Sequence, residues 1–440
     1  MNEHPPMRYH STVGTSPTTN LDGALRRGLA PDGGLYVPER LPDLRYADLA
    51  DCRNLAETAE RVLAPFFAGS SLADQLGEIT REALDLPLPV VEFERGRSWV
   101  MELFHGPTAA FKDFAARFLA ACMARLRAPD APVQTIVVAT SGDTGGAVAA
   151  AFHQRPGFRV VILYPQGRVS ARQAHQLGAF GDNIHCFCVA GDFDDCQRLA
   201  KQALNDRDLA ESRHLTSANS ISIGRLLPQI TYYAHASVQL FRRTSTAADV
   251  IVPTGNLGNA LACILAREIG LPIGEVILAT NANRTLSEYF SGQDYRGRPG
   301  LATLANAMDV GDPSNFERLA WFFRDRDLRE VGIQAFSISD EVIRRTIAAV
   351  DQSYHMEVCP HTACAVEVLH MRRKYGQFRP HLLAATAHPA KFDEVVEPLL
   401  GRAIDPPSAL AELLGRPSHA EPMAAQFDDL RRVLDRIASE

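Results

Sequence analysis

Short apolar runs alternate with longer segments of helical periodicity along most of the chain. The runs at 134–139, 159–164, 184–189, 248–253, 276–280 and 382–386 have the length and apolar content of buried strands. Helices are predicted at 147–154, 170–177 and 194–205, and in the apolar stretch that ends at residue 269. Strands that alternate with helices are typical of parallel sheets covered on both faces, so we expect an α/β fold.

Other segments depart from this alternation. Residues 52–85 are predicted to be helical, and 90–94 and 99–103 are predicted to form a hairpin. Residues 281–315 are polar and irregular, which predicts a long surface loop, and 422–439 space apolar residues along one helical face. We expect four regions: an N-terminal region at 1–92, α/β domains at 93–215 and 216–412, and a C-terminal helix at 413–440.

Composition narrows the class of protein. The 440 residues carry a net charge of −7, which argues against a nucleic-acid partner or an anionic membrane surface. No segment approaches the roughly 20 apolar residues of a membrane span, and the polar N-terminus lacks the apolar core of a signal peptide. Eight scattered cysteines without a CxxC pair predict reduced thiols, a cytoplasmic protein and no metal site.

The segment 102–114 brings the first candidate for chemistry. An apolar run breaks at Gly106-Pro107, and a helix is predicted from 109 to 127 with Thr108 as its N-cap. Lys112 then lies in the first turns of that helix beside Phe111, where the helix dipole and apolar neighbours disfavour a charged amine. A lysine with a lowered pKa is a nucleophile suited to a Schiff base. Taken alone, Lys112 is better explained as a surface lysine whose stem covers apolar residues.

Two polar loops follow predicted strands and open helices, where ligands bind in open α/β sheets. The loop 254–259 offers several backbone amides and no basic residue, which suits one small phosphate or a plain glycine turn. It lacks the Walker A and dinucleotide patterns. The loop 140–146 has small hydroxyl residues that suit a carboxylate, and Asp143 within it is either a ligand-facing group or a helix cap.

Two further polar segments complete the set of candidates. Residues 217–225 end on Arg225, which either binds a phosphate or carboxylate or forms a surface ion pair. Residues 386–391 follow the last predicted strand and bring Thr386, His388 and Lys391 to its carboxyl end. His388 is otherwise an ordinary core or surface histidine.

These segments, taken in order, resemble the threonine synthases of the long-chain bacterial and fungal type, which are fold-type II pyridoxal-phosphate enzymes. The resemblance rests on His-Gly-Pro-Thr-Ala-Ala-Phe-Lys-Asp-Phe at 105–114, Thr-Ser-Gly-Asp-Thr-Gly at 140–145, Ser-Ala-Asn-Ser at 217–220 with Arg225, Gly-Asn-Leu-Gly-Asn at 255–259, Asn-Ala-Met-Asp at 306–309 and Thr-Ala-His-Pro-Ala-Lys-Phe at 386–392. Segments 9–12 and 28–38 also resemble the N-terminal region of that family. It implies a tryptophan-synthase-β-like fold with two three-layer α/β/α domains.

The resemblance also implies a role for each candidate. Lys112, with Phe111 beside it, would hold pyridoxal 5′-phosphate covalently, and Thr386 would face the pyridine nitrogen. Asp143 would lie near the cofactor's 3′-oxygen, where many relatives carry asparagine. The cofactor phosphate would be bound by Gly255, Asn256, Leu257, Gly258 and Asn259. The substrate carboxylate would be bound by Thr140, Ser141, Gly142 and Thr144, and the leaving phosphate by Ser217, Asn219, Arg225 and Lys391.

The implied activity is that of a carbon–oxygen lyase acting on phosphates, at the last step of threonine biosynthesis. O-Phospho-L-homoserine and water would give L-threonine and phosphate by β,γ-replacement, with Lys112 moving the protons. The resemblance implies a monomer or a homodimer. The alternatives are a phosphohomoserine phospho-lyase or a serine/threonine dehydratase of the same fold, and a catalytically silent binding protein.

Overall fold

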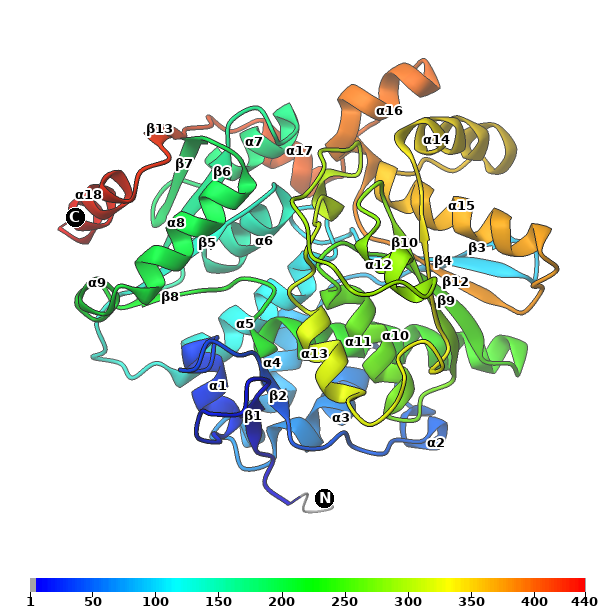
Figure 1. Cartoon of the computed structure of the whole chain (residues 1–440), viewed down its shortest axis with the longest axis horizontal. Coiled ribbons are helices and arrows are strands. Elements are labelled where there is room, and N and C mark those ends of the chain that lie inside the picture. The colour runs from blue at the N-terminus through cyan, green and yellow to red at the C-terminus, as the bar shows by residue number, and fades with distance from the viewer. Residues whose placement is uncertain (1–4, 440) are drawn as a thin grey trace.

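The computed structural model describes residues 5–439 and contains two large sheets, each flanked by helices, and one two-stranded sheet (Figure 1). The six-stranded sheet has the order β11 (Ile333–Ser337), β10 (Ile273–Thr280), β9 (Ala248–Pro253), β12 (His381–Ala385), β4 (Ser98–Glu102) and β3 (Val90–Glu94). All of its neighbours are parallel except β3 and β4, which form the predicted hairpin. The five-stranded sheet is parallel throughout, in the order β13 (Glu421–Ala424), β7 (Ile184–Ala190), β6 (Phe158–Pro165), β5 (Gln134–Ala139) and β8 (Leu215–Thr216).

Eighteen α-helices lie in the described part of the chain. They are α1 (Leu21–Arg27), α2 (Tyr46–Leu49), α3 (Leu55–Phe67), α4 (Leu76–Ala83), α5 (Lys112–Leu126), α6 (Asp143–Phe152), α7 (Ala171–Gly178), α8 (Phe193–Asn205), α9 (Arg207–Ser212), α10 (Ile223–Thr244), α11 (Gly258–Glu268), α12 (Thr285–Phe290), α13 (Phe316–Phe322), α14 (Asp340–Tyr354), α15 (Pro360–Lys374), α16 (Asp393–Leu400), α17 (Ser408–Leu414) and α18 (Phe427–Ala438). None of the helices in residues 5–439 is long and apolar enough to cross a membrane.

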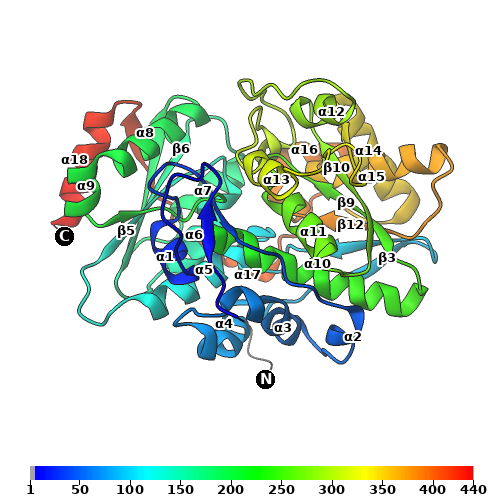
Figure 2. The same ribbon diagram turned by 60° about the horizontal axis from the view of Figure 1, so that its bottom comes forward.

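The N-terminal region forms a separate layer beneath the sheets (Figure 2). Strands β1 (Tyr9–Ser11) and β2 (Tyr36–Pro38) pair with each other, and α3 and α4 pack against α10 and α5. The apolar faces of α3 and α4 therefore contribute to the same core as the long central helices. This layer therefore covers α5 and α10 from one side.

All six strands predicted from the apolar runs are confirmed. Most of their residues are buried, as expected for strands covered on both faces, whereas β7 also has two half-buried residues and an exposed end at Ala190. The register places β12 between β9 and β4, so the carboxyl ends of these three parallel strands lie next to one another. The segments that follow these ends carry the loop 254–259, Thr386 and Lys112.

Three helix boundaries differ from the prediction. Helix α5 begins at Lys112 and not at 109, because Ala109 adopts a left-handed conformation (φ 54°) that interrupts a helix. Helix α6 begins at Asp143, inside the predicted loop, with Gly142 as its N-cap, so Asp143 is not a helix cap. The predicted C-terminal helix begins only at Phe427, since Pro422 lies in β13.

The expectation of a long surface loop or insertion at 281–315 is confirmed for 291–302, which are almost all exposed and contain no helix or strand, and is wrong for the flanking parts. The segment contains α12 and a 3₁₀ turn at Asn306–Met308, and several of its polar side chains are buried. The amide of Asn281, for example, donates to Thr303, Ala305 and Asp309. In these flanking parts the polar side chains therefore satisfy one another and buried backbone, while those of 291–302 face solvent.

The proposed division into domains stays a prediction. The boundary at residue 93 falls inside β3, which pairs with β4 in the six-stranded sheet. In the C-terminal region, β13 pairs with β7 and α18 packs against α8, at one end of the molecule (Figure 1). The chain therefore returns to the five-stranded sheet after it has completed the six-stranded one.

Candidate active site

The Lys112 segment lies directly against the segment that follows β12. The amide of Phe111 donates to the carbonyl of Thr386 at 2.9 Å, and Ala110 forms an isolated bridge with Ala387. Lys112 and Thr386 are therefore held beside each other by backbone contacts, although they are far apart in the sequence. This juxtaposition is the one that the resemblance requires.

The turn before Lys112 is closed by a buried carboxylate. Asp113 accepts a hydrogen bond from the amide of Thr108 at 2.9 Å and another from its hydroxyl at 2.6 Å. The prediction that Thr108 caps the helix is wrong, because its hydroxyl is a donor to Asp113. A side chain at Gly106 would collide with Asp113, so glycine is required there. Together these contacts hold the first turn of α5 in one position.

Burial makes Lys112 a weak base. Its side chain is 12% exposed, and its Nζ lies 4.0 Å from an Asp143 oxygen and 5.6 Å from the ring centre of Phe111. Burial, aided by the positive charges of Lys391 and Arg225 and opposed by Asp143, lowers the pKa of Lys112 to about 8. A substantial share of the amine is then neutral near physiological pH, as a nucleophile or proton acceptor requires.

We expect the reactivity of the Lys112 amine in the cofactor-free protein to rise as the pH is raised, with a midpoint near pH 8. A free lysine side chain titrates near 10.4, so at pH 7.5 the neutral fraction is raised on the order of a hundredfold. Reductive methylation over pH 6–11, followed by peptide mass spectrometry, measures this midpoint. The exposed Lys201 provides an internal reference in the same samples. A midpoint for Lys112 at or above pH 10 would contradict the prediction.

Asp143 and Lys391 form a buried ion pair beside Lys112. The Nζ of Lys391 lies 2.7 Å from Asp143 and donates to the carbonyl of Thr108 at 2.8 Å, with 1% of the lysine side chain exposed. Burial alone raises the pKa of Asp143, but Lys391 and Lys112 together hold it well below its usual range. Lys391 thus already has a carboxylate partner, so its predicted contact with a substrate phosphate would be shared with Asp143.

The loop 140–146 is tightly built around Thr140 and Gly142. The hydroxyl oxygen of Thr140 accepts from the amides of Gly142 (3.0 Å) and Gly145 (2.8 Å), which closes the loop. Gly142 has φ 125°, and a Cβ there would meet the amide of Gln173 at 2.8 Å. Ser141 and Thr144 are half-buried at the amino end of α6, where backbone amides and the helix dipole favour an anion.

The loop 254–259 has the features of a small anion site. A Cβ at Gly255 would lie 2.6 Å from Met308, so the backbone itself fills the available space. Leu257 is fully buried with φ 61°, and Gly258 opens α11. Asn259 accepts from the hydroxyls of Tyr232 (2.5 Å) and Tyr233 (2.9 Å), while its buried Nδ2 has no partner. An unused donor at a helix amino end fits a phosphate.

The segment 217–225 places an unpaired guanidinium beside that loop. Arg225 is 2% exposed, and its Nη1 donates to the carbonyl of Ala218 at 2.7 Å. Its buried Nε has no partner, nor has the Oδ1 of Asn219. Ser217 accepts from the amide of Asn219. The segment meets the loop 254–259 where the Nδ2 of Asn256 donates to Ser220 at 2.8 Å. The surface ion pair considered for Arg225 is therefore excluded.

Several contacts at the site come from residues that the sequence did not single out. Gln173 donates to Asp143 at 2.9 Å and accepts from Asn306 at the same distance, which links α7 to the turn at Asn306–Met308. His361 is buried, accepts from the amide of Ala307, and has its pKa lowered by burial to about 4. Only Asn306 lay in a recognised motif. The other two are ordinary polar residues near helix starts, so no spacing identified them.

The donor set fits pyridoxal 5′-phosphate. A nucleophilic amine, an anion loop without basic residues and a hydroxyl residue lie at three adjacent strand ends. Lys112 would hold the aldehyde carbon, the loop 254–259 the phosphate, and Thr386 the pyridine nitrogen. The orphaned Nδ2 of Asn259 and the close approach at Gly255 are the observations that support this fit.

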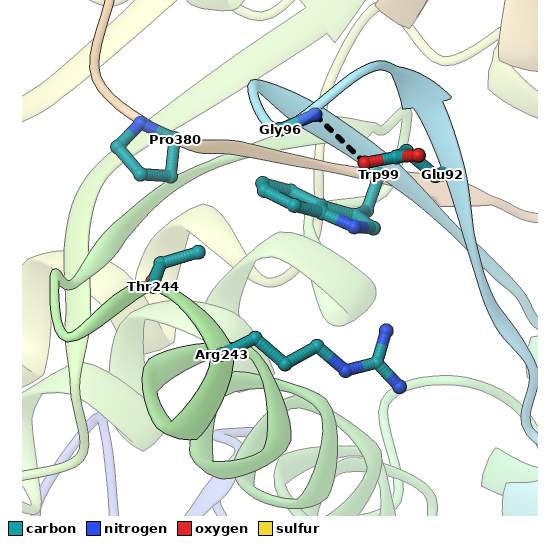
Figure 3. A pocket seen from close by; sticks show the side chains of 6 residues that line it. All are labelled: Glu92, Gly96, Trp99, Arg243, Thr244 and Pro380. Atoms are coloured by element: carbon teal, nitrogen blue, oxygen red, sulfur yellow. Dashed lines mark hydrogen bonds between the residues drawn. The ribbon is translucent and has the colours of Figure 1, made fainter.

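A separate cavity of about 550 Å³ lies at the opposite end of the six-stranded sheet (Figure 3). It is lined by Glu92, Gly96, Trp99, Arg243, Thr244 and Pro380, from the hairpin, the end of α10 and the start of β12. Since Lys112 and Thr386 follow the carboxyl ends of β4 and β12, this cavity is not part of their site.

Comparisons with known proteins agree with the site. The pyridoxal-phosphate dependent enzyme family model matches residues 86–387, and those for the threonine synthase N terminus and C-terminal region match 8–84 and 362–434. Threonine synthase from Serratia marcescens is 40% identical over 93% of this chain and 95% of its own length. The crystal structure of threonine synthase from Escherichia coli superposes with a TM-score of 0.91, at 36% identity over 98% of this chain and all of that one. A pyridoxal-phosphate-bound threonine synthase from Brucella melitensis superposes with a TM-score of 0.89, at 34% identity over 99% of this chain and all of that one.

These matches span the N-terminal layer, both sheets and the C-terminal segment, and they include each loop of the site. The implied fold is confirmed as fold-type II, and a silent binding protein of another class is excluded. The chain belongs to the threonine synthase family of pyridoxal-phosphate-dependent enzymes.

Proposed function

We propose that this enzyme converts O-phospho-L-homoserine and water to L-threonine and phosphate. The observation that carries the proposal is the position of Lys112: a buried amine of lowered pKa beside Thr386, with the anion loop at the adjacent strand end. When bound, pyridoxal phosphate supplies a ring that delocalises negative charge from the substrate. Lys112 holds the cofactor and moves the proton at the substrate's Cα.

The other candidates divide the remaining binding tasks. The backbone of Gly255–Asn259 and the free Nδ2 of Asn259 hold the cofactor phosphate. Thr386 faces the pyridine nitrogen. The substrate carboxylate binds the amides and hydroxyls of residues 140–144, at the amino end of α6. Lys391 and Lys112 keep Asp143 as a carboxylate in the cofactor-free site, so it would face the 3′-oxygen as a hydrogen-bond acceptor.

Arg225 binds the leaving phosphate in this proposal. Its guanidinium is buried, with an unpartnered Nε and no ion pair in residues 5–439. Burial lowers the pKa of Arg225 to about 10 against the opposing effect of Asp113, so Arg225 is charged at neutral pH, and the substrate phosphate would supply the ion-pair partner that it lacks. Ser217 and Asn219, on the same segment, and Lys391 are the other proposed contacts of the leaving phosphate.

Replacing Arg225 by alanine is expected to raise the KM for phosphohomoserine by at least ~30-fold. The reason is the loss of a charge-assisted contact worth about 2 kcal/mol or more. The visible absorbance of the cofactor should stay normal, since Arg225 is not assigned to the cofactor. Steady-state kinetics and the absorbance spectrum measure both. Arg213→Ala, which removes an exposed arginine paired with Asp435, is the control. Unchanged kinetics of Arg225→Ala would refute the assignment.

The function itself is tested by a product assay. The purified protein with pyridoxal phosphate and phosphohomoserine should release threonine and phosphate in equal amounts. Release of a 2-oxo acid with phosphate would instead identify a phospho-lyase. Turnover of serine or threonine to a 2-oxo acid, without use of phosphohomoserine, would identify a dehydratase.

Compartment, assembly and motion belong to the same proposal. All eight cysteines are free thiols, which supports a cytoplasmic protein. We expect a monomer or a homodimer, which light scattering after size-exclusion chromatography would measure.

The pair Asp143–Lys391 and the bond Asn306–Gln173 join segments from the two sheets, so substrate binding would draw these segments together. Identical orientations in free and ligand-bound crystals would contradict that closure.

A further inference from the structure

Arg318 is a fully buried arginine outside the groups that the proposed function uses. It lies on α13 with 0% of its surface exposed. Its Nε donates to the carbonyl of Tyr36 at 3.1 Å, its Nη1 to the side-chain oxygen of Asn315 at 2.9 Å, and its Nη2 to the carbonyl of Ile221 at 2.5 Å. Each nitrogen of the guanidinium therefore has its own acceptor.

The three acceptors come from three different parts of the chain. Tyr36 is in β2 of the N-terminal layer, and Ile221 belongs to the segment 217–225 that ends on Arg225. Asn315 also contacts the anion loop 254–259, because its Nδ2 donates to the carbonyl of Asn256 at 3.0 Å. One guanidinium thus links the N-terminal layer, the segment assigned to the substrate phosphate and the loop assigned to the cofactor phosphate.

The charge of Arg318 has no ion-pair partner. No carboxylate within residues 5–439 forms an ion pair with it; the adjacent Glu317 raises its pKa but makes its hydrogen bond with Thr12. The similarly buried Arg372 contacts Asp249 at 2.9 Å and Glu275 at 2.7 Å. Burial lowers the pKa of Arg318 to about 9. Burying a cation without a counterion costs free energy. Three neutral acceptors do not require a charged donor, so their hydrogen bonds alone do not account for the charge of Arg318.

The negative charge of two bound phosphates would compensate the buried positive charge of Arg318. The binding of either phosphate brings negative charge to a loop that Arg318 touches directly or through Asn315. The guanidinium's rigid planar fork suits it to hold three acceptors at fixed separations, which a flexible ammonium does not do.

We propose that Arg318 is a positioning residue that couples the two phosphate-binding loops and orders both against the N-terminal layer. The identity of the two phosphates rests on the proposed function. Arg318 touches neither ligand in this proposal. It acts on the cofactor phosphate through Asn315 and Asn256, and on the substrate phosphate through the backbone at Ile221.

Three variants separate the contact that runs from Arg318 through Asn315 to Asn256 from the contact between Arg318 and Ile221. Arg318→Met removes both contacts, and Asn315→Ala removes only the one toward Asn256. Arg267→Met is a matched control. Arg267 also donates to two backbone carbonyls, those of Gly332 (2.9 Å) and Val331 (2.7 Å), but at the far end of α11. The readouts are the Kd of the cofactor-free protein for pyridoxal phosphate, the Kd of the holoenzyme for inorganic phosphate by calorimetry, and the melting temperature.

Arg318→Met should weaken both bindings by roughly tenfold or more, the size expected for a lost hydrogen bond to a charged group. Asn315→Ala should weaken pyridoxal phosphate binding alone, and Arg267→Met neither. In the double variant Arg318→Met/Asn315→Ala, the loss of pyridoxal phosphate affinity should be no greater than in Arg318→Met, because both changes break one path. If Arg318→Met does not fold, Arg318→Lys keeps the charge without the fork and should show the same pattern.

The proposal is overturned if the Arg318 variants lower the melting temperature as Arg267→Met does and leave both Kd values within about twofold of the wild-type values. It is also overturned if the losses in the double variant add. Neither readout depends on turnover of phosphohomoserine. A wild-type enzyme that fails to make threonine would therefore refute the proposed function while the coupling of the two loops is still measured.

Discussion

Lys112→Ala is expected to lower the rate of threonine formation by at least ~10³-fold, the largest effect of any single substitution in this chain. The change removes both the covalent anchor of the cofactor and the base at Cα, and a positioned acid or base alone contributes roughly 10²–10⁴-fold. The fold should persist, because the variant removes a buried amine whose charge burial disfavours. The measurement is single-turnover threonine formation with saturating pyridoxal phosphate.

The chain offers a clean test of the anchor itself, because it contains four lysines. Lys201 and Lys374 are exposed, and Lys112 and Lys391 are buried side by side near Asp143. Borohydride reduction of the holoenzyme should therefore attach the cofactor to the peptide that contains Lys112 and to none of the other three. Lys201→Ala, the control, should retain both label and activity. Label on Lys391 in the wild-type enzyme would contradict the assignment.

The strands of this fold could be predicted because the apolar sequence of each strand by itself indicates that both of its faces are buried. The run Ile136-Val137-Val138 is apolar on both faces, as a strand between two helix layers must be, and the same holds for β6 and β9. Glycine-rich turns after such strands then marked the two loops. Asn256 and Gly142 could be placed at strand ends without any knowledge of tertiary structure.

Contacts between distant segments could not be predicted in this way. Asp143 allowed two local readings, a cap or a ligand-facing group, and the structure adds a third, since Lys391 pairs with it from the other sheet. Arg318 lies in α13, a short helix just beyond a segment whose polar composition indicated a loop. The backbone groups that Arg318 satisfies belong to residues remote in sequence, and local periodicity carries no information about them.

Lys391→Met is expected to lower the free energy of unfolding by about 3–5 kcal/mol, the largest effect on stability among these substitutions. The change leaves the carboxylate of Asp143 buried without its 2.7 Å partner, and the remaining cation, Lys112, lies 4.0 Å away. Urea denaturation of wild-type and variant proteins, at equal pyridoxal phosphate concentration because bound ligand adds stability, measures the difference. Arg207→Met, which breaks the exposed pair with Glu211, should change stability by less than ~0.5 kcal/mol.

The pH dependence identifies Asp143 as the source of that loss. In the wild-type protein the pKa of Asp143 is held below its unfolded value near 3.9, so its contribution to stability is present above about pH 4 and is lost as the pH falls through the folded pKa. Without Lys391 the folded pKa rises, and Asp143 protonates before the unfolded chain does. The difference between the two proteins should therefore be largest near neutral pH, begin to shrink as the pH falls through the raised folded pKa of the variant, and vanish below the lowered folded pKa of the wild type. Asp143→Asn in the Lys391→Met background should recover much of the loss, since no buried carboxylate remains to be compensated. A loss that stays constant from pH 7 to pH 3, or that the second substitution deepens, would show that Lys391 stabilises the protein through packing and the carbonyl of Thr108 instead of through Asp143.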